Sequence, residues 1–305
     1  MKIVIAGGTG FLGGALAERL SSDGHEVVVL TRRAKSSDRR VRTVAWTPEG
    51  GVGPWSVELD GAAAVVNLAG ESIAGRRWSP AHKQEILDSR TRATRSLTAA
   101  IARASDPPSV FVSGSAVGYY GPRGEEVVTE ATPPGHDFLA RVCAQWEDDA
   151  NQAASPQTRV ICVRTGLVLE RDGGALPQML PPFKFGVGGP IGSGRQYWPW
   201  IHRADWIDLV RWSIATKAAS GPLNGTAPNP VTNGEFAAAL GRALHRPALI
   251  PAPAFALRIV LGEMADALLL SGQRAVPAKA EALGFTFKYS RLGDALGVIF
   301  GRLKA

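Results

Sequence analysis

The chain has 305 residues, of which 45% are hydrophobic and 20% are charged, and its formal net charge is +7. This length is large for one domain but fits an α/β core that carries a second, smaller lobe. The lysines and arginines are scattered, which argues against a nucleic-acid-binding protein, and no apolar run reaches the roughly 18 residues of a membrane-spanning helix.

The first half of the chain alternates short apolar runs with segments of helical spacing. The apolar runs predict strands at Lys2–Ala6, Glu26–Leu30, Val41–Trp46, Ala63–Leu68, Ser109–Ser113 and Arg159–Arg164. Helical spacing predicts helices at Phe11–Leu20, Pro80–Ala104 and Phe138–Ala153. Because parallel strands buried on both faces read as unbroken apolar runs, this alternation predicts an α/β fold of the Rossmann type, with a doubly wound parallel sheet.

The second half of the chain has a different composition. After Gly166 it is rich in glycine and proline, and Gly173-Gly174, Pro181-Pro182 and 186–194 read as turns and loops. Later elements are predicted at Asp205–Thr216 (helix), Leu223–Ala227 (strand), Thr232–Leu244 and Ala254–Leu270 (helices), with closing segments at Pro277–Leu283 and Arg291–Ile299. We expect a dinucleotide-binding domain at 1–170 and a smaller C-terminal substrate lobe at 171–305, with the part near 205–230 returning to the core.

A glycine-rich turn joins the first predicted strand to the first predicted helix. Gly7 permits a tight turn, Gly10 lets the backbone approach a pyrophosphate, and Gly13 lets the helix pack close to the strand. Free N–H groups at the helix start then bind the phosphates. The alternative is a plain strand-to-helix turn. The pattern predicts cofactor contacts from Gly7, Thr9, Gly10, Phe11, Leu12 and Gly13.

The end of the second predicted strand indicates which dinucleotide binds. NAD sites usually carry an acid there, which binds the ribose 2′-OH, whereas an arginine accommodates the 2′-phosphate of NADP. This strand ends in Thr31-Arg32-Arg33 without an acid, so we predict NADP(H), bound by Arg32 and Arg33, with a solvated basic turn as the alternative. The run that ends the fourth predicted strand is expected to make backbone contacts to the adenosine side of the cofactor; it comprises Asn67, Leu68, Ala69 and Gly70.

The two cysteines, Cys143 and Cys162, lie in apolar stretches and fit no metal-ligand spacing. They are too few for a disulfide framework, so we expect buried, reduced thiols. The N-terminal apolar run is shorter than the core of a signal peptide. These features predict a cytoplasmic protein without a bound metal.

Four segments together resemble the short-chain dehydrogenase/reductase superfamily in its extended form. They are residues 67–78, 113–121 and 192–202, and the stretch from Val276-Pro277-Ala278-Lys279 to 284–287. The likeness is to the atypical branch labelled "NAD-dependent epimerase family protein", which carries a C-terminal region of unknown function. It covers nearly the whole chain and implies a Rossmann domain with a nicotinamide cofactor. Many superfamily members dimerise through two long helices, so a homodimer is one expectation.

The superfamily implies a catalytic Ser, a Tyr, and a Lys four residues after the Tyr. Ser115 matches the Ser position, but Asp137 falls where the Tyr is expected and Arg141 where the Lys is expected. The resemblance leads us to expect that Arg141 holds the cofactor ribose and that Tyr120, just past Ser115, carries the proton or forms an aromatic wall. Arg164 is a further expected cofactor contact.

Three functions are compatible with these residues. The leading hypothesis is an NADP(H)-dependent oxidoreductase acting on an unidentified small hydroxyl or carbonyl compound. The second is a non-catalytic, NADP(H)-responsive regulatory protein, which the missing Tyr and Lys favour. The third is a nucleotide-sugar epimerase, which follows the family label but needs the same Tyr. The retained Ser115 and the tryptophans of the second lobe favour an enzyme.

Overall fold

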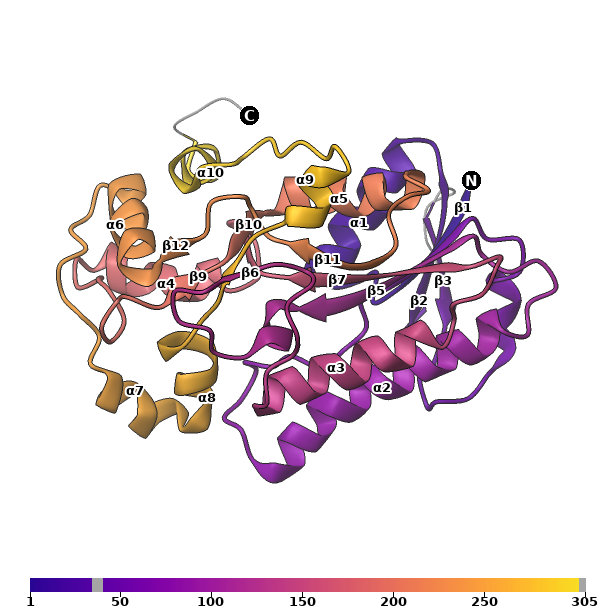
Figure 1. Ribbon diagram of the computed structural model, residues 1–305, viewed down its shortest axis with the longest axis horizontal. Helices are drawn as coiled ribbons and strands as arrows, with labels where there is room; N and C mark the ends of the chain where they lie inside the picture. The colour runs from indigo at the N-terminus through magenta and orange to yellow at the C-terminus, as the bar shows by residue number, and fades with distance from the viewer. Residues whose placement is uncertain (35–40, 302–305) are drawn as a thin grey trace.

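The computed structural model describes residues 1–34 and 41–301, and at its centre lies a seven-stranded parallel sheet (Figure 1). The strand order is β11-β7-β5-β4-β1-β2-β3. The strands are β1 (Lys2–Ala6), β2 (Glu26–Thr31), β3 (Val41–Ala45), β4 (Ala64–Asn67), β5 (Val110–Ala116), β7 (Arg159–Thr165) and β11 (Gly221–Gly225). The order reverses between β1 and β4, which is the switch point where doubly wound sheets bind ligands. The predicted Rossmann-type fold is confirmed.

Helices cover both faces of this sheet (Figure 1). α2 and α3 pack together over one face, and α1 and α5 over the other. The four are α1 (Phe11–Ser22), α2 (Pro80–Ile101), α3 (Phe138–Asn151) and α5 (Arg203–Ala215). Successive side chains of β1 divide between the two cores, with Ile3 and Ile5 on the side of α1 and Val4 and Ala6 on the side of α2. Burial on both faces explains why these strands could be recognised as unbroken apolar runs.

A smaller group of elements lies beyond the carboxyl ends of the strands, at the left of Figure 1. It has a core of its own, in which Trp200, Phe236 and Leu296 are buried. Its main elements are β8 (Leu167–Leu169), α4 (Leu176–Lys184), β9 (Tyr197–Trp198), β10 (Trp200–His202), β12 (Val231–Thr232), α6 (Asn233–Leu244), α7 (Ala254–Leu261), α8 (Glu263–Ala265), the π-helical turn η3 (Asp266–Leu270) and α10 (Leu292–Ile299). The remaining short elements are η1 (Pro54–Glu58), η2 (Val117–Tyr120), β6 (Val127–Val128), β13 (Arg274–Ala275) and α9 (Ala278–Ala282).

Part of the second half of the chain belongs to the main sheet. β11 pairs in parallel with β7, and α9 packs against β11. α5 contributes Trp206 and Val210 to the core on the α1 side of the sheet. The division into 1–170 and 171–305 stays a prediction.

Two elements differ from the sequence prediction. The loop predicted around Pro181-Pro182 is wrong, because α4 continues through both prolines. This helix buries Leu180 and Phe183 against the lobe core, and that packing outweighs the poor helix propensity of proline. The single helix predicted at Ala254–Leu270 is broken at Gly262, whose φ of +63° no α-helix accommodates.

Cys143 and Cys162 are both buried and free, as the sequence predicts. Along residues 1–34 and 41–301, no helix is both long and apolar enough to cross a membrane. The cytoplasmic location stays a prediction.

Candidate functional site

The glycine-rich turn lies at the end of β1, against the end of β4. Gly7 has a φ of +80°, and a Cβ there would lie 2.7 Å from the carbonyl carbon of Leu68. A Cβ on Gly13 would lie 2.3 Å from the carbonyl oxygen of Gly7. Gly10 is different, since the closest atom to its Cβ position is 3.4 Å away. Packing therefore requires Gly7 and Gly13, whereas Gly10 keeps the start of α1 open to whatever lies in front of it.

Two cavities meet at this turn. Gly7, Gly10, Leu68 and Glu71 line both of them. The smaller cavity has a volume of about 300 Å³ and the larger about 600 Å³. Both lie at the carboxyl ends of β1 and β4, at the switch point of the sheet.

The smaller cavity is bounded by the ends of β2 and β3. The predicted residues that line it are Thr9, Arg32, Ala69 and Gly70, in addition to those shared with the larger cavity. Arg32 is exposed and has no ion-pair partner among the described residues, while the buried Trp46 supplies an aromatic wall. Arg33 lines neither cavity. A flat indole beside a free guanidinium suits a purine next to a phosphate, and only Arg32 of the predicted pair is placed for it.

Asn67 lies behind the cavity walls. Its side-chain amide donates to Thr94 Oγ1 at 2.9 Å, and its Oδ1 accepts from the Ala69 backbone N–H at 3.2 Å. The side chain is fully buried. Asn67 therefore shapes the turn that carries Leu68 and Ala69, and the cofactor contact expected of its backbone stays a prediction.

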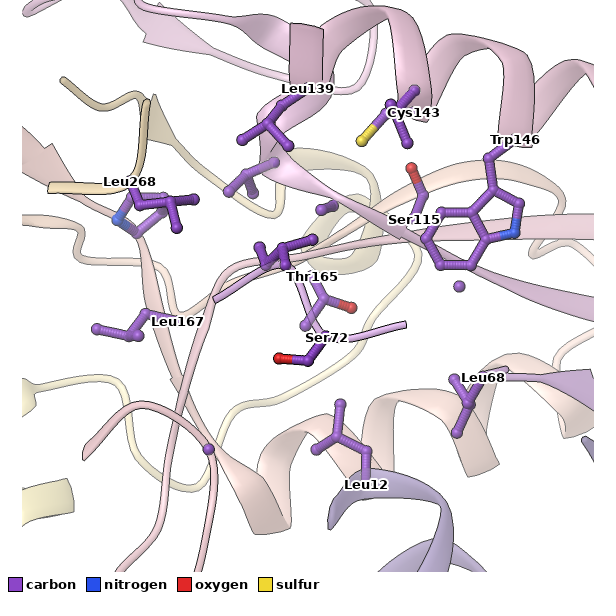
Figure 2. A pocket seen from close by; sticks show the side chains of 18 of the residues that line it. Leu12, Leu68, Ser72, Ser115, Leu139, Cys143, Trp146, Thr165, Leu167 and Leu268 are labelled. Carbon is purple, nitrogen blue, oxygen red and sulfur yellow. The ribbon is translucent and has the colours of Figure 1, made fainter. Parts of the chain in front are cut away.

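The larger cavity extends from the glycine turn toward the C-terminal lobe (Figure 2). Of the predicted residues, Gly7, Gly10, Phe11, Leu12, Gly13, Leu68 and Ser115 line it. In the view of Figure 2, Leu12 and Leu68 mark one end, and Leu167 and Leu268 mark the other. Ser115 lies near Cys143 and Trp146 of α3. The cavity thus connects the predicted phosphate-binding turn with the C-terminal lobe, and Ser115 supplies a hydroxyl along its wall.

Ser115 belongs to a buried polar network. Its Oγ donates to Glu147 Oε1 at 2.6 Å. Arg164 holds the same carboxylate with two bonds of 2.8 Å, from Nε to Oε1 and from a terminal nitrogen to Oε2. Ser115, Glu147 and Arg164 are each less than 10% exposed. A hydroxyl in the cavity wall is therefore oriented by a carboxylate whose position is itself fixed.

Arg164, predicted to contact the cofactor, lies outside both cavities. Arg164 lines neither cavity, and its guanidinium is occupied by Glu147, the Tyr120 hydroxyl and the Glu130 carbonyl. It also lies 3.5 Å from the centre of the Tyr119 ring. Burial acts to lower the pKa of Arg164, but the hydrogen bonds and charge of Glu147 outweigh it and raise the pKa. Arg164 is a permanent structural cation beneath Ser115.

The expectation that Tyr120 carries a proton is also corrected. Its side chain is fully buried, and its hydroxyl donates to Asn224 Oδ1 at 2.7 Å. It lines neither cavity, and burial raises its pKa to about 12. Tyr120 therefore connects η2 to β11 inside the protein, away from both cavities.

The register of α3 explains why Arg141, predicted to hold the cofactor ribose, lines neither cavity. The residues of α3 that line the larger cavity are Leu139, Val142, Cys143 and Trp146, which share one face at helical spacing. Arg141 is exposed and donates to the His136 carbonyl at 2.6 Å. Asp137 caps the helix by accepting from the Ala140 backbone N–H. Leu139 with Cys143 and Val142 with Trp146 are therefore the two pairs four residues apart that face the cavity.

None of these side chains forms a Tyr–Lys pair. Leu139 has no proton to transfer, and burial raises the pKa of Cys143 to about 12. Glu147, one turn after Cys143, was missed by the sequence analysis. Its signal was an acid on the apolar stripe of a predicted helix, in phase with Cys143 and Ala150. Trp46 was missed because only the fold places the end of β3 beside Arg32.

Comparison with known proteins agrees with this geometry. Residues 3–224 match the model of the NAD dependent epimerase/dehydratase family, and residues 252–299 match a domain of unknown function, DUF1731. The chain belongs to the NAD dependent epimerase/dehydratase family. An epimerase family protein of Mycobacterium leprae (strain TN) is 43% identical over 294 residues, which cover 96% of this chain and 94% of the relative. The resemblance to extended short-chain dehydrogenases/reductases is confirmed.

Two solved structures of this epimerase family are similar along the chain. Human epimerase family protein SDR39U1 (isoform 2), solved with NADPH, has a TM-score of 0.88 and 37% identity, covering 99% of this chain and 100% of that one. A nucleoside-diphosphate sugar epimerase of Corynebacterium glutamicum has a TM-score of 0.79 and 34% identity, covering 99% of this chain and 58% of that one. These likenesses extend through the C-terminal lobe as well as the Rossmann sheet.

Proposed function

We propose that this family member binds NADP(H) across the two cavities. The glycine turn and the open start of α1 suit the pyrophosphate, and Arg32 suits the 2′-phosphate of the adenosine half. The absence of an acid at the end of β2 favours NADP(H) over NAD(H). The similar human protein, solved with NADPH, supports the same choice.

We further propose that the protein is an oxidoreductase that interconverts a carbonyl compound and its alcohol. The observation that carries this proposal is the Ser115 hydroxyl, which lies in the wall of the larger cavity and is oriented by Glu147. The cofactor, when bound, supplies or accepts the hydride. Ser115 binds the oxygen of the substrate beside it.

The chain provides one path for the proton. Glu147 is hydrogen-bonded to Ser115, and two bonds from Arg164 hold its carboxylate in place. In the direction of oxidation, the substrate hydroxyl passes its proton to Ser115 Oγ while the Ser115 proton moves to Glu147. In the direction of reduction, the proton returns along the same path. Glu147 thereby takes the place of the Tyr that the superfamily pattern requires.

A second function is favoured by the apolar face of α3. With Leu139 and Cys143 facing the cavity, the protein lacks the Tyr–Lys pair that usually drives turnover. A non-catalytic protein that binds NADP(H) and reports its redox state to a partner needs neither residue. Such a protein would bind NADP(H) with the same selectivity but would not consume NADPH with any carbonyl compound.

The test is a calorimetric titration with NADPH, NADP⁺, NADH and NAD⁺ of the wild type, Arg32→Glu and the matched control Arg33→Glu. We expect preferential NADP(H) binding in the wild type and at least tenfold weaker NADP(H) binding in Arg32→Glu. NAD(H) binding should change little in that variant, and Arg33→Glu should resemble the wild type. Equal losses for both cofactors in Arg32→Glu would contradict the 2′-phosphate contact, and no binding of any dinucleotide would contradict the proposed function.

A further inference from the structure

The larger cavity has an apolar end that is built from separate parts of the chain. Leu139 comes from α3, Met179 from α4 and Leu268 from η3. Leu167 also belongs to this wall. Figure 2 shows Leu139, Leu167 and Leu268 around the same end of the cavity, away from the glycine turn. A ligand seated there exchanges water for aliphatic side chains, which favours apolar ligand surface.

No cation lines this end of the cavity in the part of the chain that the structure describes. Arg90 is the one Lys or Arg that lines the larger cavity there, and its guanidinium lies 5.3 Å from the centre of the Trp146 ring, beside Gly70. Arg90 therefore belongs to the glycine-turn end. Arg274 is outside the lining and packs over the Tyr197 ring. A diphosphate buried at the apolar end would have no Lys or Arg to pair with, which is unfavourable for a charged group.

The segment that carries Leu268 is held firmly in place. Gln196 Nε2 donates to the Leu269 carbonyl at 2.8 Å, and the Arg123 backbone N–H donates to the Gly272 carbonyl at 3.1 Å. A Cβ on Gly272 would lie 1.9 Å from the Tyr197 carbonyl oxygen, so the two backbones are in close contact. The apolar wall is therefore formed before a ligand arrives, and one side of it belongs to the C-terminal region at 252–299.

We propose that the substrate seated at this apolar end is an uncharged, largely apolar carbonyl compound or its alcohol. This inference rests on the proposed oxidoreductase function. The Ser115 hydroxyl meets one substrate oxygen, and the aliphatic side chains of the apolar end meet the hydrocarbon part of the substrate. In reduction, NADPH gives a hydride to the carbonyl carbon and the Glu147–Ser115 path gives a proton to the oxygen, so that an alcohol and NADP⁺ result. A nucleotide sugar, with its diphosphate, does not fit this subsite.

The test uses the NADP⁺-loaded protein, in which an added ketone binds without turnover. Acetophenone, cyclohexanone and UDP-glucose are titrated by calorimetry into the wild type, Leu268→Arg, Met179→Lys and Leu249→Arg. Leu249→Arg is the matched control, because Leu249 is 81% exposed on the lobe surface. NADP⁺ binding by each variant is measured first and shows that the variant is folded.

We expect at least one ketone to bind the wild type and Leu249→Arg equally, and at least tenfold more weakly to Leu268→Arg and Met179→Lys. UDP-glucose should bind none of them detectably. Three results would overturn the substrate class while leaving the cofactor site intact. They are tighter binding of UDP-glucose than of both ketones, unchanged ketone affinity in both cavity variants, and no ketone binding to the NADP⁺-loaded wild type. Failure of the wild type to bind NADP⁺ would instead remove the proposed function on which the inference rests.

Discussion

The buried Arg164–Glu147 pair gives the sharpest stability prediction. We consider Glu147→Leu, which keeps an aliphatic side chain of similar size but removes the charge. The substitution deletes both bonds of 2.8 Å from Arg164 and the bond of 2.6 Å from Ser115. The Arg164 guanidinium then retains only the Tyr120 hydroxyl and the Glu130 carbonyl as hydrogen-bond acceptors.

The expected cost follows from the burial of both partners. Their side chains are 4% and 8% exposed, so the remaining charge cannot be solvated. Leaving such a charge unpaired lowers the free energy of unfolding by about 3–5 kcal/mol. Replacing both charges with apolar residues, as in Arg164→Met with Glu147→Leu, should cost less than either single change, because no buried charge is left.

The measurement is urea unfolding followed by tryptophan fluorescence, for both single variants and the double variant. The control is Asp88→Asn, which breaks the exposed Arg92–Asp88 pair and should cost about 0.5 kcal/mol or less. A loss below about 1 kcal/mol for Glu147→Leu would refute the reasoning, since a buried ion pair that loses one partner costs more than that. A double variant that loses as much as both singles together would refute it as well.

Two further predictions concern buried titratable groups. Burial raises the pKa of Cys143 to about 12 and also raises the pKa of Cys162. Neither thiol should therefore react with iodoacetamide in the native protein at pH 8, while both should react in urea. Rapid labelling of the native protein would contradict this prediction. Burial lowers the pKa of His202, whose Nδ1 accepts the Ala204 backbone N–H and must stay unprotonated for that bond. The unfolded state therefore takes up the proton first as the pH falls through about 6.5, so the free energy of unfolding should decrease between pH 7.5 and pH 5.5. His202→Asn, which also caps a helix, should weaken this dependence in urea unfolding at the two pH values, and an identical dependence would contradict the assignment.

Much of the cofactor half could be predicted because its signals are local. Strand β1, the glycine turn and helix α1 occupy consecutive residues, so the spacing of Gly7, Gly10 and Gly13 already implies their geometry. Arg32 follows β2 directly, and its place beside the smaller cavity follows from the βαβ unit. Arg33 shows the limit of this reasoning, because neighbouring side chains on one turn point in different directions.

The errors at the substrate half arose where contacts join distant segments. Arg164, Tyr120 and Glu147 lie on β7, on η2 and on α3, and no sequence pattern shows that they bond to one another. The helix register of α3 decided that Leu139 and Cys143 face the cavity while Arg141 faces solvent. Shifting the superfamily pattern by two residues along a helix moves each position by about 200° around the helix axis. A residue expected to face the cavity then faces solvent.

The sequence alone determined the family, the doubly wound fold and the phosphate-binding turn of this protein. Buried parallel strands and glycine turns each consist of consecutive residues, so their patterns can be recognised in the sequence. Only the tertiary structure decided which hydroxyl is supported by a buried carboxylate and which side chains close the far end of the cavity. Ser115 and Glu147 are 32 residues apart, and the wall at Leu268 comes from the last part of the chain. Such long-range contacts depend on the packing of whole elements, which the local pattern of residues does not encode.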